Sequence, residues 1–226
     1  MMRPRATVSE PALEFFPALQ AVESVRHGFV GRIPGIDVAT DRAAALARLD
    51  AAHRAIRAQL GLADTAFATA EQVHGNEIAV IDESLSEDRC FPGADGLVTN
   101  QRGVSLGIYV ADCCAVFVVD PVRHAIGLVH SGKKGTESAI VARAITKIRR
   151  HFDSAPRDLI VQLSPCIRPP HYEVDFANEI VRQTRACGVE QVQDAGRCTA
   201  CDLQSYYSYR AEKARTGRML ALLALA

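Results

Sequence analysis

Between residues 77 and 129 the chain is a series of short apolar or alternating runs, and this pattern limits the possible folds more than any other feature. Glycine, aspartate or proline separates each run from the next, as expected for β-strands joined by turns. Two similar runs lie outside this region. The predicted strands are 27–30, 77–81, 96–99, 104–110, 115–119, 125–129 and 158–163. We therefore expect a domain rich in β-structure.

Amphipathic segments on both sides of this β-rich region predict helices. In the first segment, apolar residues from Leu46 to Leu60 recur at three- and four-residue spacing, which places them on one helix face. Asp41 is suited to cap the start of this helix and Gly61 its end, and Thr136 is suited to cap the second helix. The predicted helices are 41–60, 136–152 and 175–187.

These elements predict the α+β fold class, in the form of a single domain with mixed β-sheets flanked by helices. The chain has 226 residues, of which 48% are hydrophobic, and this is enough for one buried core. The sequence contains no internal repeat and no obvious linker. The predicted domain covers residues 25–226, and residues 1–24 are predicted to form an irregular N-terminal segment.

The charge balance and the cysteines indicate where the protein acts. Lys plus Arg and Asp plus Glu both number 26, so the net charge gives no general attraction to nucleic acid or to an anionic membrane. No segment approaches the roughly 18 apolar residues of a membrane span, and residues 11–17 are too interrupted for a signal peptide. The seven cysteines, with Cys113 and Cys114 adjacent, make a poor disulfide framework. We expect a cytoplasmic protein with reduced thiols; its oligomeric state is left open.

A predicted hairpin between residues 113 and 130 gives the first indication of a metal-binding site. Asp120-Pro-Val-Arg123 resembles a turn with proline in its second position. A symmetric hairpin that pairs Asp120 with Arg123 also pairs Cys113 with His130. Side chains directly opposed in this way have Cβ atoms about 4.5–5.5 Å apart, which is close enough to share a metal ion.

A third ligand is available in His74, which lies in Gln72-Val-His-Gly75 just before a predicted strand. Two histidines and a cysteine give three ligands and leave a fourth position for water, which is the pattern of catalytic zinc. On spacing alone, a histidine or cysteine in a β-rich region is more often a packed core residue, and that alternative stays open at this point.

Short motifs occur in order from about residue 27 to residue 218. They are Gln72-Val-His-Gly75, Ala94-Asp-Gly-Leu-Val-Thr-Asn100, Ala111-Asp-Cys113, His130-Ser-Gly132, Gly135-Thr136, Pro165-Cys-Ile167, Tyr172-Glu-Val174, Cys198-Thr199, Tyr207-Ser-Tyr-Arg210 and Thr216-Gly-Arg218. Together they resemble the laccase-domain family, also called multicopper polyphenol oxidase-like or peptidoglycan editing factor proteins.

The resemblance implies an α/β/β/α sandwich with zinc ligands at His74, Cys113 and His130. It also implies phosphorolysis of adenosine, inosine and methylthioadenosine, and deamination of adenosine, so that the expected partners are a small nucleoside and phosphate. The older family name implies copper-dependent oxidation of phenols. Bacterial members are also linked to removal of wrongly incorporated serine from cell-wall precursors.

The sequence departs from the family pattern in three segments, namely Gly31-Arg-Ile-Pro-Gly35, Ser164-Pro-Cys-Ile167 and the segment that begins at His130. The family usually has His-Ala-Gly-Trp-Arg-Gly, whereas this chain has His130-Ser-Gly-Lys-Lys-Gly135, and it contains no tryptophan at all. Lys134 therefore stands where the family has arginine. Arginine holds phosphate with a planar fork, whereas lysine is a hydrated point charge. The exchange predicts that phosphorolysis is the weaker of the two nucleoside activities.

Other residues are candidates for the same site. Asp112 is a candidate proton shuttle and Cys166 a candidate catalytic thiol. Arg32, Lys134 and Arg210 are candidate cations for phosphate or substrate. The alternatives are that Asp112 caps a strand end, that Cys166 is a core residue, and that the three cations are solvated or ion-paired. Another motif, Cys198-Thr-Ala-Cys201, is typical of zinc or redox sites, but no second such pair lies near it.

The sequence thus predicts a zinc-dependent enzyme that acts on purine nucleosides by phosphorolysis, deamination or both. One alternative is an amidase that edits peptidoglycan precursors. A second alternative is a weakly catalytic binding protein that retains the metal site. Copper oxidase activity is least supported, because one cluster of three ligands does not provide the several copper centres that reduction of oxygen to water requires.

Overall fold

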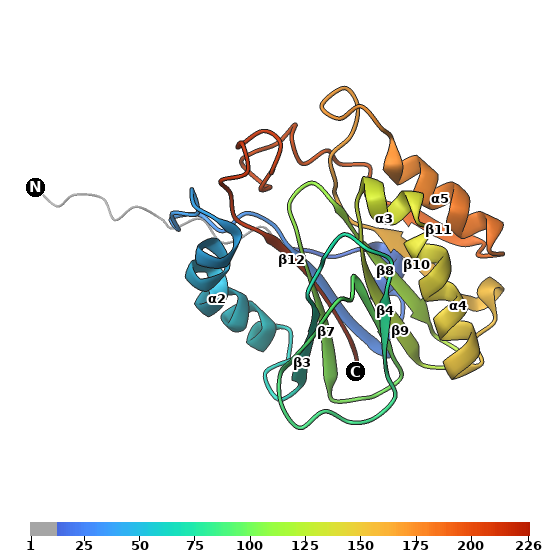
Figure 1. Cartoon of the computed structure of the whole chain (residues 1–226). Helices are drawn as coiled ribbons and strands as arrows, with labels where there is room; N and C mark the ends of the chain where they lie inside the picture. The colour runs from blue at the N-terminus through green and yellow to red at the C-terminus, as the bar shows by residue number, and fades with distance from the viewer. Residues whose placement is uncertain (1–12) are drawn as a thin grey trace, which may run out of the picture.

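The computed structural model describes residues 13–226 and contains two six-stranded β-sheets packed face to face between helices (Figure 1). Helix α2 (Arg42–Gln59) packs on the outer side of the first sheet, and α4 (Ile140–Phe152) and α5 (Phe176–Ala186) lie on the outer side of the second. The predicted single α+β domain with mixed sheets is confirmed.

Both sheets contain parallel and antiparallel pairs. The first sheet has the order β1 (Leu13–Glu14), β2 (Val25–Val30), β12 (Met219–Leu225), β7 (Val104–Val110), β3 (Ala66–Ala70) and β5 (Arg89–Phe91). The second sheet has the order β11 (Gln191–Asp194), β10 (Ile160–Leu163), β8 (Cys114–Asp120), β9 (Ala125–Ser131), β6 (Gly96–Thr99) and β4 (Ile78–Ile81). The shorter helical elements are α1 (Pro17–Gln20), α3 (Lys133–Glu137) and the 3₁₀ turn η1 (Pro156–Asp158).

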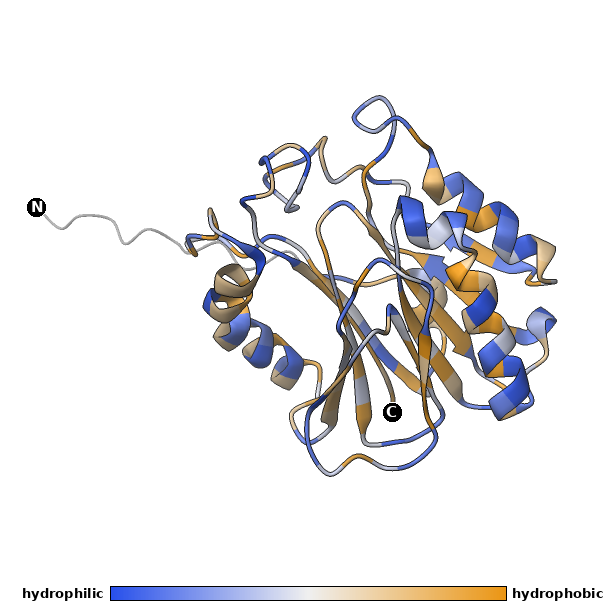
Figure 2. Cartoon of the chain, viewed as in Figure 1, coloured by the Kyte–Doolittle hydropathy of each residue, from blue (hydrophilic) through white to orange (hydrophobic). Residues whose placement is uncertain are grey.

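The central strands of the second sheet are buried on both faces, and their side chains alternate between two hydrophobic cores. In β8, Phe117 faces the first sheet, whereas Cys114 faces α4 and α5. Figure 2 shows apolar residues concentrated on the strands and polar residues on the outer faces of the helices. By the same alternation, Cys113 and His130 point toward the space between the two sheets, where Cys113 packs against the first core.

The predicted pairing of Cys113 with His130 across the hairpin is wrong by two residues. His130 pairs with Ala115, and the loop between the strands runs from Asp120 to Ala125. Asp120 Oδ1 accepts hydrogen bonds from the backbone N–H groups two and three residues later, at 2.8 and 3.0 Å, and these bonds hold a longer loop. A shift of two residues keeps every side chain on its original face, so the two ligands still share one face.

The predicted helix 136–152 is interrupted. Ala139 has a left-handed backbone and separates α3 from α4. Thr136 is therefore not a cap. It lies inside α3, where its hydroxyl donates to the carbonyl of Gly132 at 2.8 Å. The predicted helices 41–60 and 175–187 agree with α2 and α5, and Asp41 caps α2 by accepting a hydrogen bond from the Ala44 N–H at 3.0 Å.

The N-terminal segment predicted to be irregular lies partly outside the described residues, which begin at residue 13. Its described part contains β1, which pairs with β2, and the short helix α1. The predicted strands did not include β3, β5, β11 or β12. No helix within residues 13–226 combines the length and apolar character that crossing a membrane requires.

Candidate metal centre and its pocket

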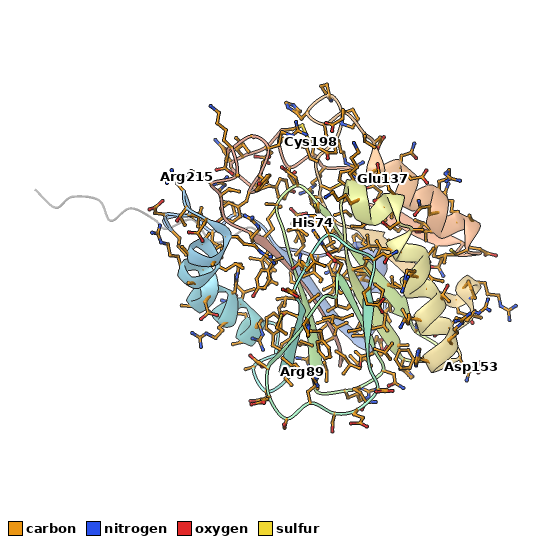
Figure 3. The ribbon with its side chains drawn as sticks, viewed as in Figure 1. His74, Arg89, Glu137, Asp153, Cys198 and Arg215 are labelled. Atoms are coloured by element: carbon orange, nitrogen blue, oxygen red, sulfur yellow. A yellow bond between two sulfur atoms is a disulfide. The ribbon has the colours of Figure 1, made fainter. Side chains whose placement is uncertain are left out.

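Three side chains with metal-binding atoms meet at one end of the sandwich. His74 lies between β3 and β4, Cys113 lies just before β8, and His130 lies in β9. Their ligand atoms all lie within 4.8 Å of one another. The two imidazole rings meet edge to face, with centroids 4.8 Å apart. The three predicted metal ligands thus come together. Figure 3 shows His74 at the end of the sandwich nearest the loop that contains Cys198.

The segment that carries His74 has an unusual backbone held by a side chain. Gln72 and His74 have φ angles of 64° and 62°, in the left-handed region that few residues other than glycine adopt. The Gln72 amide donates to the Tyr109 carbonyl at 2.6 Å and accepts from the Tyr109 N–H at 3.0 Å. This double hydrogen bond fastens the segment to β7 and thereby fixes the direction of the His74 side chain.

A buried carboxylate, Asp95, joins two of the ligands. Its Oδ1 accepts hydrogen bonds from the backbone N–H of His74 and from Nδ1 of His130, both at 2.9 Å, and its Oδ2 accepts from the Gly75 N–H at 2.7 Å. With the proton of His130 on Nδ1, the Nε2 atom is free to bind a metal. Such a carboxylate–histidine pair is the usual support of a metal ligand.

The pKa values of Cys113 and His130 are shifted in opposite directions, and both shifts affect metal binding. Burial raises the pKa of the Cys113 thiol, but hydrogen bonds from His130 and His74 outweigh this effect and lower the pKa to about 6. Burial lowers the pKa of His130, whereas its hydrogen bonds to Asp95 and Cys113 raise it to about 9. These opposite shifts favour a thiolate beside an imidazolium when no metal is bound. A metal ion replaces the imidazolium proton, so its binding is coupled to pH.

The donor set fits zinc. Two imidazole nitrogens and one thiolate supply three ligands and leave one position open, as in catalytic zinc sites. The thiolate has room because residue 132 is glycine, since a Cβ atom on Gly132 would lie 2.5 Å from the Cys113 Sγ. Within the described chain, this is the one group of three such side chains whose atoms could hold a metal ion.

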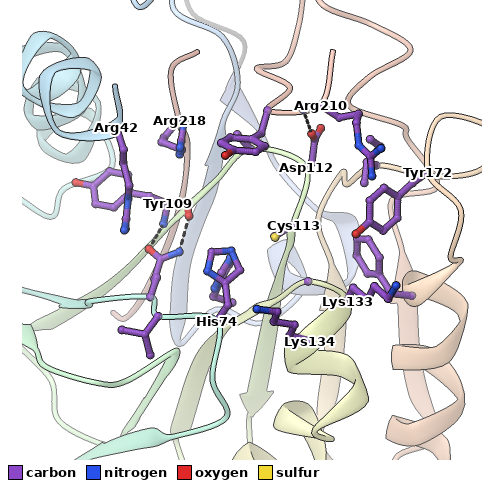
Figure 4. A pocket seen from close by; sticks show the side chains of 18 residues that line it. Arg42, His74, Tyr109, Asp112, Cys113, Lys133, Lys134, Tyr172, Arg210 and Arg218 are labelled. Carbon is purple, nitrogen blue, oxygen red and sulfur yellow. Dashed lines mark hydrogen bonds between the residues drawn. The ribbon is translucent and has the colours of Figure 1, made fainter. Parts of the chain in front are cut away.

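The cluster opens into a pocket of about 790 Å³. Figure 4 shows that its labelled aromatic rings and its labelled cations other than Lys134 form two ends on either side of His74, whereas Lys134 lies between them. One end contains Arg42, Tyr109 and Arg218. The other end contains Lys133, Tyr172 and Arg210. Phe176 and Tyr209 also line the pocket.

The second end is aromatic and carries balanced charges. The Tyr172 and Phe176 rings meet edge to face at 5.8 Å. The Arg210 guanidinium lies 4.9 Å from the centre of the Tyr172 ring. Glu173 lies 3.1 Å from Arg210 and 4.0 Å from Lys133, so both cations have a carboxylate partner. A flat, neutral ligand therefore suits this end better than an anion does.

Three of the other candidate residues line the same pocket, namely Asp112, Lys134 and Arg210. Asp112 is 7% exposed and both of its oxygens accept hydrogen bonds, one from the Thr199 hydroxyl and one from the backbone N–H of Arg210, each at 2.7 Å. Its carboxylate thus joins the strand end before Cys113 to the C-terminal loops. Lys134 is exposed on α3.

Cys166 and Arg32 do not line the pocket. Cys166 is fully buried, and its contact with Cys114, together with burial, raises the pKa of its thiol. Arg32 pairs with Glu212 at 2.8 Å, and its guanidinium lies 4.4 Å from the centre of the Tyr207 ring. Both residues hold the structure together outside the pocket, in agreement with the alternatives stated for them.

The Cys198-Thr-Ala-Cys201 motif forms a disulfide, which corrects the expectation that all thiols are reduced. Thr199 lies between the two cysteines, and its hydroxyl donates a hydrogen bond to the Asp112 carboxylate. The disulfide therefore lies in a loop that is joined by one hydrogen bond to Asp112, the residue before Cys113.

Sequence reasoning missed Asp95, Arg42, Arg218 and the aromatic residues of the pocket. Asp95 lies in one of the recognised motifs, but no local pattern shows that it contacts a histidine 35 residues away. Arg42 follows a helix cap and resembles an ordinary surface residue. Arg218 lies in the motif Thr216-Gly-Arg218, which was the available signal for it.

Comparison with known proteins yields a family match over nearly the whole described chain. A family model described as multi-copper polyphenol oxidoreductase laccase matches residues 24–186 and 175–226. A purine nucleoside phosphorylase of Corynebacterium glutamicum is 29% identical over 190 residues, which cover 73% of this chain and 76% of that protein. The purine nucleoside phosphorylase YlmD of Geobacillus stearothermophilus is 29% identical over 194 residues, which cover 68% and 70%.

Solved structures show the same fold. The crystal structure of YlmD from Geobacillus stearothermophilus has a TM-score of 0.78 at 24% identity and covers 90% of this chain and 93% of that one. The crystal structure of the hypothetical protein YfiH from Bacillus licheniformis has a TM-score of 0.77 at 21% identity and covers 89% and 93%.

Proposed function

Because the chain belongs to the multi-copper polyphenol oxidoreductase laccase family, we propose that it is a zinc-dependent enzyme that phosphorolyses purine nucleosides. The observation that carries this proposal is the position of the His74, Cys113 and His130 cluster in a large pocket between an aromatic end and a cationic end. The similarity to relatives that are named purine nucleoside phosphorylases supports it.

The two ends suit the two reactants. A purine is flat and neutral, and Tyr172 and Phe176 offer it aromatic surfaces. Phosphate is an oxyanion and suits the end with uncompensated cations. A ligand that spans the pocket would place its ribose near the cluster between them. When bound, zinc would supply Lewis-acid polarisation of a substrate oxygen or nitrogen.

Phosphorolysis transfers a ribosyl group. A phosphate oxygen forms a bond to the ribose C1′ atom while the bond from C1′ to the purine nitrogen breaks. The electron pair of the broken bond stays on the purine, which takes the proton from the P–OH group of hydrogen phosphate. The products are ribose 1-phosphate and the free base. The protein contributes by orienting the two reactants and by excluding water from C1′.

Adenosine deamination is the second candidate, because Asp112 lies in the pocket beside Cys113 and could move a proton. In this reaction water replaces the amino group of adenosine, and ammonia and inosine are formed. Both carboxylate oxygens of Asp112 already accept structural hydrogen bonds. A role as proton shuttle would have to break one of them, and we therefore rank deamination below phosphorolysis.

The test measures metal content and products together. We expect about one zinc per chain by elemental analysis, and phosphate-dependent release of adenine from adenosine. Cys113→Ala should lose both zinc and activity. Inosine formed without phosphate would favour deamination instead. If zinc-loaded protein releases no product from adenosine, inosine or methylthioadenosine, the proposal is wrong, and the amidase and binding-protein alternatives become the better explanations.

A further inference from the structure

The charges that line the pocket are not balanced. Five cationic side chains line it, and Asp112 is the one carboxylate among the lining residues. Glu173 pairs with two of the cations, Lys133 and Arg210. Both oxygens of Asp112 already accept hydrogen bonds from other groups. Of the five pocket cations, Arg42, Lys134 and Arg218 therefore have no carboxylate partner among residues 13–226.

Arg218 is the most unusual of these cations because it is 9% exposed. Its Nη1 donates to the carbonyls of Thr216 and Gly217 at 3.0 and 2.9 Å. These carbonyls hold the guanidinium in place but carry no net charge. The Tyr209 ring centre lies 5.9 Å away and adds a weak cation–π contact. The guanidinium of Arg218 has five N–H groups, and those that do not bind these carbonyls can donate to a ligand in the pocket.

Arg42 reaches the same end of the pocket from the first turn of α2. Its two Nη atoms donate to the carbonyl of Glu71 at 3.3 and 3.2 Å. Both guanidiniums line the same pocket, and burial together with the positive charge of Arg42 lowers the pKa of Arg218. Figure 4 shows both on the side of His74 opposite Tyr172.

Two neighbouring guanidiniums without an anion cost free energy in a partly desolvated site. An oxyanion between them would remove that cost. Arginine is also the residue whose planar fork matches phosphate oxygens in pairs. Lys134 is different, because it is an exposed ammonium without a planar fork. Arg218, which is 9% exposed, therefore has more to gain from an anion than Lys134 has.

We propose that Arg42 and Arg218 form a binding subsite for a phosphoryl oxyanion at the end of the pocket away from Tyr172. The existence of the subsite follows from the charge balance, whereas its use for the phosphate that attacks ribose rests on the proposed function. The replacement of the family arginine by Lys134 then leaves the main phosphate contact intact. The expectation from sequence that phosphorolysis is weak is accordingly withdrawn.

The oxyanion has two possible sources. Inorganic phosphate would occupy the subsite as the second substrate of phosphorolysis. A nucleotide would place its own phosphoryl group there. The two sources differ in whether free phosphate is needed, so adenosine with phosphate and AMP without phosphate are the two arms of the test.

The experiment compares four variants of the zinc-loaded protein. Arg42→Gln removes one charge at an exposed position, and Arg218→Lys keeps the charge but removes the fork. Lys134→Gln tests the cation that the sequence favoured. Arg48→Gln is the matched control, because Arg48 lies on the same helix as Arg42 but pairs with Asp37 outside the pocket. Phosphate and AMP affinities are measured by calorimetry, and KM for phosphate and for adenosine by product assay.

Loss of one charged hydrogen-bonding group should weaken binding of the anion about 10- to 100-fold. We expect this loss in the phosphate affinity of Arg42→Gln and Arg218→Lys, with KM for adenosine nearly unchanged and with Lys134→Gln and Arg48→Gln close to wild type. A matching loss in AMP affinity, with phosphate affinity unchanged, would assign the subsite to a substrate phosphoryl group. Because Arg42 is exposed, its variant should fold even if Arg218→Lys does not.

Failure of the subsite differs from failure of the proposed function. If wild-type protein phosphorolyses adenosine and neither arginine variant changes the affinity for phosphate or AMP, the subsite is wrong and the function stands. If no nucleoside is turned over but both arginine variants lose phosphate or AMP binding, the subsite stands and the function is wrong.

Discussion

The carboxylate of Asp95 offers the sharpest test of how the metal centre is built. It is fully buried and accepts three hydrogen bonds, from the backbone N–H groups of His74 and Gly75 and from the ring of His130. Asp95→Asn has nearly the same shape, but one acceptor oxygen becomes an NH₂ donor. In the better orientation the remaining oxygen faces the two histidines, and the NH₂ group then points at the N–H of Gly75.

The size of the effect follows from these contacts. One hydrogen bond to a charged acceptor is lost, which costs about 1.5–3 kcal/mol, and the two that remain become weaker because the charge is gone. We expect the free energy of unfolding to fall by about 2–4 kcal/mol. Loss of a carboxylate that supports a ligating histidine typically lowers metal affinity by about 10- to 100-fold. Zinc affinity should therefore fall together with stability.

The assay is competition for zinc with a chromophoric chelator, with unfolding in urea measured on the same samples. Glu77→Gln is the control. Glu77 lies near the same segment, but its carboxylate makes exposed ion pairs with Arg143 and Lys147. Exposed pairs contribute at most about 1 kcal/mol, so zinc affinity should not change. If Asp95→Asn binds zinc within about twofold of wild type, the carboxylate does not support the ligand and the reasoning fails.

Three other positions provide tests of neighbouring contacts. Gly132→Ala should lower zinc affinity, because its Cβ would lie 2.5 Å from the Cys113 Sγ, but should change the free energy of unfolding little, because its φ of −103° suits alanine. Unchanged zinc affinity in the chelator assay would contradict this. Gln72→Leu should lower the free energy of unfolding in urea by about 1–3 kcal/mol, because the backbone N–H and C=O of Tyr109 lose their partners. An unchanged urea midpoint would show that water replaces the two hydrogen bonds of the Gln72 amide. Burial lowers the pKa of His27 to about 4 from its ordinary 6.5. Between these values the unfolded chain binds a proton that the native chain does not, so stability falls as pH falls. His27→Gln should reduce the fall between pH 7 and 5 by about 2 kcal/mol, and equal falls in the two proteins would refute the assignment.

The features that sequence predicted correctly are those with local causes. Helix α2 has an apolar repeat, a cap at Asp41 and a glycine after its end, all within one segment. The two hairpin ligands were predicted on one face even though their register was wrong, because a face depends on whether residue numbers are odd or even and a shift of two does not change that. The loop length depended on a side-chain hydrogen bond of Asp120 that composition does not reveal.

The features that sequence missed depend on distant contacts. The run Met219–Leu225 contains only methionine, leucine and alanine, which favour helices in isolation, yet it forms a strand because β2 and β7 pair with it on both sides. Arg42 and Arg218 are far apart in the chain and line the same pocket only in the folded structure. Charge balance in a pocket can be judged only after the fold has brought its walls together.

The position of β12 also sets an order of events during protein synthesis. This strand is the last that the ribosome makes among those described, yet it lies between β2 and β7 in the middle of the first sheet. Until it emerges, the two halves of that sheet have no hydrogen-bonded connection. Arg218 directly precedes β12, so the arginine end of the pocket is completed in the same step. A nascent chain therefore carries all three metal ligands well before it can form the pocket, and premature binding of metal would take place on a protein that cannot yet act on a substrate.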